Sequence, residues 1–318
     1  MSTLIISLLL LFHLHSDTID YSNYYKEVIE IEEMIADELY SDALNLYQSL
    51  FNQYPFIFKR DLIIAAQLAL FLNEKTKAEA LILRCFKSGW EWKHFKKNKW
   101  LDEVFSAEEI KVFKEKAAQF NKDYFSQLDL STREKVHLMF KKDQQKALGA
   151  FFKMGDKAYD KYTNTKFAPH SENQLATLKE IMKVKGYPGE QLIGNSYWGS
   201  TILSHHNSIS YEYVKQDTLF DDLKPYLKKS LKNGQISPYE LALMEDWKNA
   251  VLNDTTTKPF GYLNPPIETN INQINNNRRG IGLRSVELRN QLVKIEEKTG
   301  LNFYLPDWVK GEIKILEN

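Results

Sequence analysis

The residues best suited to chemistry lie in one stretch, from 186 to 213, which reads GYPGEQLIGNSYWGSTILSHHNSISYEY. It holds the only adjacent pair of histidines in the chain, His205 and His206. An imidazole changes charge near neutral pH and has two ring nitrogens that need partners, so two of them side by side are unusual in a packed core. We therefore expect this stretch to contribute to a polar pocket.

Asp246 is the carboxylate that we expect beside this pair. It lies in YELALMEDWKNAV, next to the apolar stripe of a predicted helix, where Ala242 and Ala250 leave room for another group. A carboxylate that orients an imidazole raises its basicity, so His206 would act as general base and Asp246 as its partner in a hydrolase. A purely structural histidine–carboxylate pair is the alternative, since no nucleophile is marked.

Other catalytic and cofactor motifs are missing from the sequence. The histidines do not occur in HxxxH or HExxH spacing, so no metal site is predicted. Ser200 and Ser204 lie near the histidines but not in a G-x-S-x-G elbow. The run RRGIG from Arg278 has too few glycines to cradle a phosphate, and we predict no cofactor. Arg279 could clamp a ligand carboxylate or form a surface ion pair.

The composition is that of a globular protein without net charge. Apolar residues make up 43% and charged residues 26%, and 42 basic residues balance 42 acidic ones. Binding to nucleic acid is disfavoured, because it requires a basic excess. The length of 318 residues allows two domains. The single cysteine, Cys85, is expected to be buried and inert.

The amino terminus, MSTLIISLLLLFHLHSDT, is typical of an export signal. Its apolar run from Leu4 to Phe12 has the length of a signal-peptide core and is too short to span a bilayer. We predict a signal peptide over residues 1–16 and an exported protein, periplasmic or extracellular, with no membrane span. An apolar helix that docks on the body of the protein is the alternative.

Residues 17–130 are expected to form a helical-repeat module. The segment ALNLYQSLFNQYP from Ala43 aligns with AEALILRCFKSGW from Ala78, 35 residues later. A small residue early in a helix, a large one four later and a break after the last turn resemble tetratricopeptide helix pairs. The resemblance implies a concave face that would bind a protein or peptide partner. The predicted helices are 24–37, 41–53, 59–72, 76–87 and 107–125, the last with a capping box from Ser106 to Glu109.

Residues 131–318 are expected to form a compact helical domain. Periodicity and caps predict helices over 132–162, 171–185, 197–206, 219–232, 238–252 and 285–298, the second with a capping box from Ser171 to Gln174 and the last ending at Gly300. The Asn-, Thr- and Pro-rich segment 253–277 is predicted to be an ordered loop. Only 312–316 could form a short strand, so the predicted class is all-α.

The second part resembles an uncharacterised bacterial domain family of unknown function. The matching positions are Asp143–Gln144, Asn173, Gly186–Tyr187–Pro188, His206, Gly234, Asp246, Phe260–Gly261 and Arg279 with Gly282–Leu283. His205 stands where the family usually has Gln, and Trp247 where it has Arg. The resemblance implies a fold and a list of positions, but no reaction. We expect Asn173, Tyr187, His205, Phe260 and Arg279 to contact a ligand.

The sequence thus favours a binding protein over an enzyme. Helix pairs without a catalytic signature are most often interaction modules. The repeat module would hold a protein or peptide, and the second domain a small ligand in a polar pocket built from Gly186–Pro188, the two histidines, Asp246 and the Phe260–Gly261 turn. A hydrolase with His206 as general base is the alternative.

Overall fold

Helices build the part of the chain that the computed structural model describes, namely residues 19–253, 259–305 and 309–317. The predicted all-α class is confirmed. Within these ranges the only extended pairing is an isolated bridge between Ile267 and Leu316, so the possible strand at 312–316 is reduced to one residue. None of the described helices is long and apolar enough to cross a bilayer. The predicted signal peptide lies outside the described residues.

The amino-terminal group of helices follows the predicted order, with two short helices added before α7. Its elements are α1 (Ser22–Ala36), α2 (Tyr40–Gln53), α3 (Lys59–Phe71), α4 (Lys75–Lys87), α5 (Trp92–Phe95), α6 (Leu101–Val104) and α7 (Ala107–Gln127). The pairs α1–α2 and α3–α4 pack together, and α4 packs on α7. The predicted capping box from Ser106 to Glu109 is present and starts α7. Cys85 is buried, and burial raises the pKa of its thiol.

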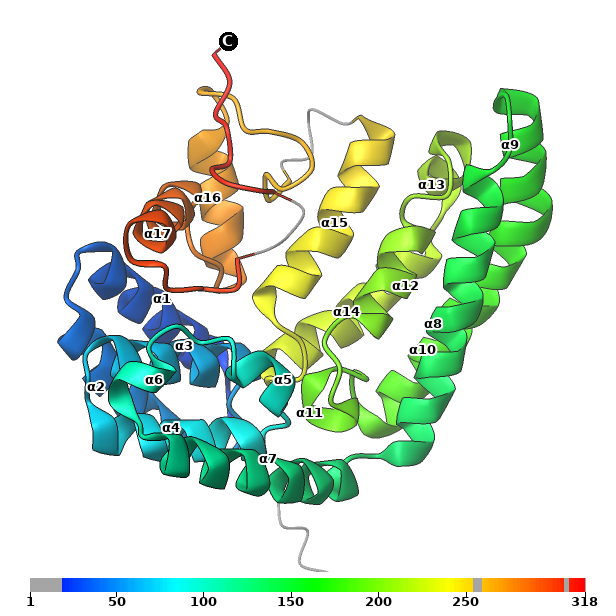
Figure 1. The fold of residues 1–318 in the computed structure, drawn as a ribbon. Helices are drawn as coiled ribbons and strands as arrows, with labels where there is room; N and C mark the ends of the chain where they lie inside the picture. Colours follow the sequence, from blue (N-terminus) through cyan, green and yellow to red (C-terminus); the bar gives the residue numbers. More distant parts are fainter. Residues whose placement is uncertain (1–18, 254–258, 306–308, 318) are drawn as a thin grey trace, which may run out of the picture.

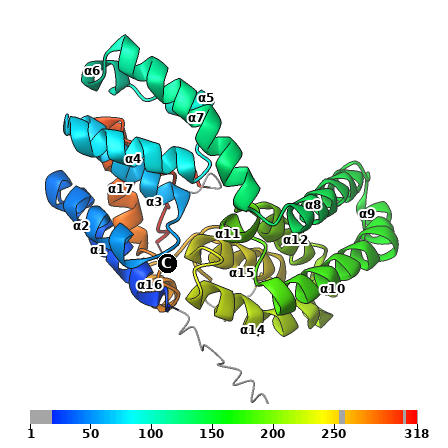
Figure 2. The ribbon, with the colours of Figure 1, turned by 90° about the horizontal axis from the view of Figure 1, so that it is seen from below.

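The second group stands beside the first, and α7 leads from the first group to the second (Figures 1 and 2). Its elements are α8 (Leu130–Phe151), α9 (Asp156–Tyr162), a π-helical turn (Thr163–Phe167), α10 (Ala168–Lys185), α11 (Glu190–Ile193), α12 (Trp198–His206), α13 (Tyr211–Gln216), α14 (Leu219–Lys232) and α15 (Pro238–Leu252). Its core lies between α10, α12, α14 and α15, with Leu178, Ile202 and Phe220 fully buried.

Three local predictions in this region are wrong. The helix predicted over 132–162 breaks before α9, where Gly155 takes a φ of 85° that glycine adopts most readily. Helix α10 begins at Ala168, so Ser171 lies inside it and is not a cap. The predicted loop 253–277 runs into a further helix, α16 (Ile271–Gly280).

The carboxy-terminal helix α17 (Val286–Thr299) belongs to the core of the first group. It packs on α1, and Leu292 and Phe303 join the same buried cluster as Tyr24. We call residues 300–305, which follow α17, the strap. The strap lies on α3, where Gln67 donates a hydrogen bond to Asn302 O (2.8 Å). The packing therefore does not follow the predicted division into 17–130 and 131–318. The face shared by α1 and α3, where a repeat module would bind its partner, is covered by the chain's own carboxy-terminal segment.

Further contacts tie the two groups together. Tyr25 on α1 donates its hydroxyl to Leu231 O (3.0 Å) in the last turn of α14 and to Ile236 O (3.1 Å) after that helix. Glu190 on α11 accepts the backbone N–H of Lys59 (2.7 Å) at the start of α3. It thus satisfies one of the donors that a helix leaves open at its amino terminus. The second group is held against the first by specific hydrogen bonds.

Candidate functional site

His205 forms the most exposed histidine–carboxylate pair of the second group. Its Nδ1 lies 2.5 Å from Oδ2 of Asp143, which α8 supplies across the interface with α12. The His205 side chain is 27% exposed, whereas that of Asp143 is completely buried. A buried carboxylate fixes the orientation of the ring and leaves Nε2 for an external group. This arrangement suits a ligand contact or a general base.

His206 is enclosed on all sides. Its Nδ1 lies 3.0 Å from Ser171 Oγ, and its Nε2 lies 3.2 Å from Asp217 Oδ2, within ion-pair distance but poorly aligned for a hydrogen bond. The ring of Tyr213 meets it edge to face. Burial alone would raise the pKa of Asp217, but His206 and two backbone N–H groups hold it below its ordinary value. His206 has no exposed surface on which to meet a substrate.

Asp246 does not orient His206, contrary to the prediction. Its carboxylate accepts the backbone N–H groups of Phe260 (2.5 Å) and Tyr262 (2.7 Å). No hydrogen bond or ion pair joins the described side chains of Asp246 and His206. Burial raises the pKa of Asp246 to about 6, although the two N–H groups oppose the shift. The sequence identified a carboxylate with room beside it, but a loop backbone fills that room. The carboxylate beside His206, predicted to be Asp246, is that of Asp217.

The other predicted ligand contacts do not converge on the histidines. Asn173 is exposed on α10 and donates to Pro169 O of its own helix (2.8 Å). Tyr187 is buried in the core, with its hydroxyl 3.5 Å from Glu240 Oε1. Arg279 is exposed and bonds Asn276. The single pocket expected from these residues is therefore not formed.

Of the adjacent arginines Arg278 and Arg279, Arg278 is the one that enters the interior. It is fully buried, donates to Phe260 O (2.6 Å) and Arg284 O (2.6 Å), and lies over the ring of Tyr262. Asp246 and Arg278 hold the same turn from two sides, since Phe260 donates to one and accepts from the other. This cluster explains why the Phe260–Gly261 turn is ordered, and its role is structural.

Buried polar atoms without a hydrogen-bond partner concentrate around the histidines. Ten such side-chain atoms occur among the described residues, and six belong to α8, α10, α12 or the residue after it. These six are Asp143 Oδ1, His170 Nε2, Gln174 Oε1, Ser204 Oγ, His206 Nε2 and Asn207 Oδ1. An unpaired buried polar atom costs about 1–3 kcal/mol, so a concentration of them calls for an explanation.

His170, near the start of α10, is half-buried and lies close enough to Asp143 for the two charges to interact. Burial lowers the pKa of His170, with Asp143 opposing and Lys146 and Lys142 adding to the shift. A lowered pKa keeps the imidazole neutral at neutral pH, when each ring nitrogen can still donate or accept one hydrogen bond. His170, His205 and Asp143 therefore form the candidate site.

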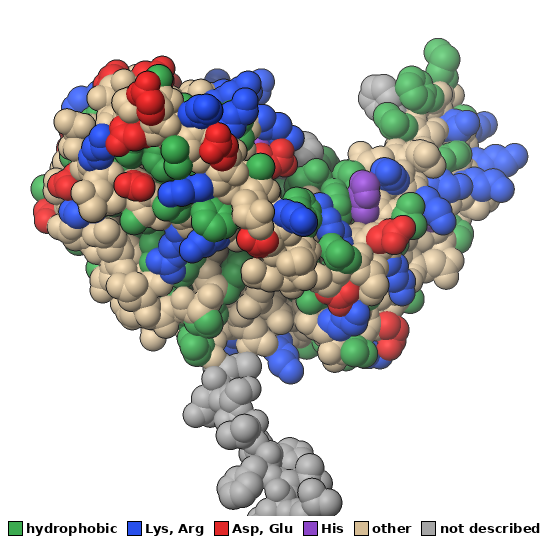
Figure 3. Space-filling view, turned by 60° about the horizontal axis from the view of Figure 1, so that its bottom comes forward, with side chains coloured by type: hydrophobic (Ala, Val, Ile, Leu, Met, Phe, Trp, Pro, Cys, Tyr) green, Lys and Arg blue, Asp and Glu red, His purple; other side chains and the backbone are tan. Residues whose placement is uncertain are grey.

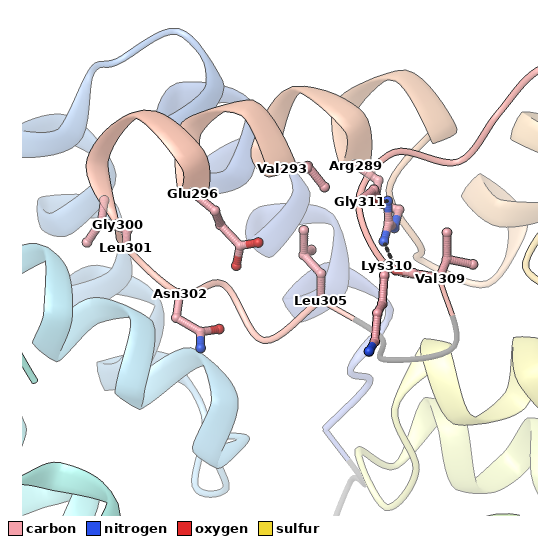
Figure 4. Close-up of a pocket in the computed structure, with 10 residues that line it drawn as sticks. All are labelled: Arg289, Val293, Glu296, Gly300, Leu301, Asn302, Leu305, Val309, Lys310 and Gly311. Carbon is pink, nitrogen blue, oxygen red and sulfur yellow. Dashed lines mark hydrogen bonds between the residues drawn. The ribbon is translucent and has the colours of Figure 1, made fainter. Parts of the chain in front are cut away.

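Two cavities of the described surface lie elsewhere. One, of about 460 Å³, lies between α17, the strap and residues 309–311 (Figure 4). Its lining includes Arg289, Glu296, Asn302 and Lys310. The other, of about 450 Å³, lies between α14, α15 and α16, and its lining includes Phe260. Of the predicted site residues, Phe260 alone lines either of them.

Acidic, histidine and cysteine side chains do not gather into a metal site anywhere in the ranges that the structure describes. The carboxylate of Glu190 caps α3.

Asp143 is the site residue that the chemical argument from sequence missed. It lies in KKDQQK, where an acid between lysines looks like part of a solvated face. The signal that could have found it is the Asp143–Gln144 match in the family resemblance. The partners Ser171 and Asp217 carried no comparable signal.

The fold and the site define an all-α protein with a polar layer between three helices of its second group. Comparison with protein-family models, with curated proteins and with solved structures returned no match. The resemblances to an uncharacterised bacterial family and to tetratricopeptide repeats thus stay predictions.

Proposed function

We propose that this chain is a ligand-binding protein and that its ligand contacts His205 and His170 around Asp143. The observation that carries the proposal is the concentration of unpartnered buried polar atoms on α8, α10 and α12. Even without His206 Nε2, which faces Asp217, five such atoms remain in this layer. A polar ligand at its exposed edge would pair with the nearest of them.

The second group of helices is favoured over the repeat module as the binding element. The face of α1 and α3 is covered by α17 and by the strap that carries Asn302. A partner on that face would have to displace a buried part of the core, including Leu292 and Phe303. His205, in contrast, offers a ring edge to solvent in the folded chain.

A thermal-shift screen of the purified protein tests the proposal. The probes are inorganic phosphate, acetate, glycine and glucose, which present anionic, zwitterionic and hydroxyl groups. At least one probe should raise the melting midpoint of the wild type, and the rise should disappear in His205→Ala and Asp143→Asn. The control is His137→Ala, a histidine of α8 that stacks on Trp198 instead. Equal responses in all four proteins would contradict the proposal.

An enzyme is the second candidate, and the His205–Asp143 distance of 2.5 Å favours it. We propose His205, in place of His206, as the general base, because its ring is oriented by a buried carboxylate and reaches solvent. Hydrolysis of a nitrophenyl ester should then exceed that by His205→Ala by at least about 100-fold. Equal rates would remove the catalytic role and leave the binding role in place.

A further inference from the structure

The end of the α8–α9 hairpin exposes large apolar side chains. Leu148 is 55% exposed, Phe152 73% and Met154 93%. We call these three residues, with Lys153 and Lys157, the tip. In Figure 1 the hairpin rises at the edge of the molecule, and in Figure 3 hydrophobic side chains gather at the end of this arm. Contiguous exposed apolar surface marks an interaction site more often than singly scattered residues do.

The tip lies at the end of a hairpin in which α8 and α9 pack against each other. Tyr162 on α9 donates its hydroxyl to Lys146 O on α8 (3.2 Å), and a Cβ at Gly149 would lie 2.2 Å from that hydroxyl oxygen. The two helices thus approach closely at Gly149, and Lys153 Nζ lies over the Tyr162 ring (5.1 Å). This packing holds the two sides of the hairpin together and leaves Phe152 and Met154 at its end.

Lysines lie along the hairpin that carries the tip. Residues 141–166 contain seven lysines and three aspartates, in a chain with no net charge overall. Asp143 is buried against His205, whereas six of the lysines are exposed. These six are Lys141, Lys142, Lys153, Lys157, Lys161 and Lys166. Figure 3 shows Lys and Arg side chains along the flank of the arm.

We propose that the tip docks on an anionic phospholipid surface. Phe152 and Met154 would enter the boundary between headgroups and acyl chains, and the lysines would contact lipid phosphates and carboxylates. Apolar residues beside a basic surface suit this boundary, because an anionic leaflet attracts basic residues that lie near it. An apolar protein groove would accept Phe152 and Met154 but gives no reason for the exposed lysines along the hairpin.

Co-sedimentation of the whole protein with lipid vesicles tests the proposal. Binding to vesicles of phosphatidylcholine mixed with phosphatidylserine should exceed binding to pure phosphatidylcholine by at least about tenfold, and added salt should weaken it. Phe152→Ser with Met154→Ser should reduce it at least about tenfold, as should Lys157→Glu with Lys161→Glu. Circular dichroism would confirm that the variants are folded.

Matched controls carry the same changes elsewhere. Val184→Ser alters a 79% exposed apolar residue on α10, and Lys111→Glu with Lys114→Glu alters two exposed lysines of α7. Both should bind as the wild type does. The fluorescence of Phe152→Trp should shift to the blue with the mixed vesicles only. Equal binding to both kinds of vesicle, or unchanged binding by the tip variants, would overturn the proposal. Self-association that depends on the tip, without vesicle binding, would also overturn it.

Discussion

Glu32 on α1 and Arg284, just before α17, form a buried ion pair between positions 252 residues apart. Arg284 Nε lies 2.5 Å from Glu32 Oε2, and Arg284 Nη2 lies 2.6 Å from Oε1. Arg60 on α3 contacts the same carboxylate at 2.6 Å. Burial would raise the pKa of Glu32, but the two arginines hold it below its ordinary value. One carboxylate thus joins α1, α3 and the segment that leads into α17.

Removing this carboxylate should destabilise the whole first group. Glu32→Gln leaves Arg284 and Arg60 without their shared counter-charge, so we expect the free energy of unfolding to fall by about 3–5 kcal/mol. Urea denaturation measures the change. The control is Lys298→Ala, which removes a pair with Glu38 that also links α17 to the α1–α2 region but is exposed. That variant should lose no more than about 1 kcal/mol. Similar losses in the two variants would contradict the assigned role of Glu32.

Two glycines of one short run should respond oppositely to alanine. Gly282 has a φ of 78°, and a Cβ there would lie 2.5 Å from Cβ of Tyr25. Tyr25 is held by its two hydrogen bonds to the second group and cannot move aside freely. Gly282→Ala should therefore lower the free energy of unfolding by roughly 2 kcal/mol or more.

Gly280→Ala is the control, because no heavy atom lies within 4 Å of the added Cβ and the position ends α16. It should be neutral or stabilise by up to about 1 kcal/mol. Thermal denaturation compares the two. A destabilised Gly280→Ala with an unaffected Gly282→Ala would show that the approach to Tyr25 is not what restricts this segment.

The two adjacent histidines should separate into a structural and a functional residue. His206→Ala removes a fully buried ring between Ser171 and Asp217, so we expect a loss of about 2–4 kcal/mol in the free energy of unfolding. His205→Ala removes a partly exposed ring and should cost about 1–2 kcal/mol. Urea denaturation of both variants measures this. A larger loss for His205→Ala than for His206→Ala would reverse the assignment.

Glu240 should make stability depend on pH. Burial raises its pKa to about 8, although Ser237 donates to it at 2.9 Å and opposes the shift. Tyr187 and the charge of Glu190 also face it. Between the unfolded value of 4.5 and about 8, the folded chain holds a proton that the unfolded chain has lost. This group's contribution to the free energy of unfolding therefore falls as pH rises through that window.

Urea denaturation at about pH 5 and about pH 8 tests this dependence. Glu240→Gln should remove this group's part of the decline, on the order of a few kcal/mol, and gain relative to the wild type at the higher pH. Glu212→Gln, an exposed acid on α13, should keep the wild-type slope. An unchanged slope in Glu240→Gln would mean that Glu240 is ionised throughout.

Local chemistry in the sequence predicted most elements correctly. The capping box from Ser106 to Glu109 starts α7, and Gly300 ends α17 in a left-handed conformation. These features depend on residues a few positions apart, so they can be read without a fold. The capping-box pattern at Ser171 and Gln174 predicted a helix start wrongly, because both side chains lie inside α10 and contact other helices. Ser171 contacts His206, and Gln174 donates to Met139 O.

The sequence by itself determined the all-α class, the burial of Cys85 and the stretch that contains His205 and His206. It could not assign their partners. Asp143 lies 62 residues from His205 and Glu32 lies 252 from Arg284, and nothing local distinguishes these acids from solvated ones. Only the tertiary packing buries them, and burial is what makes a carboxylate require a specific cation or imidazole. Packing likewise placed α17 on α1, because the apolar face of the first helices had to be covered and α17 supplied a matching one.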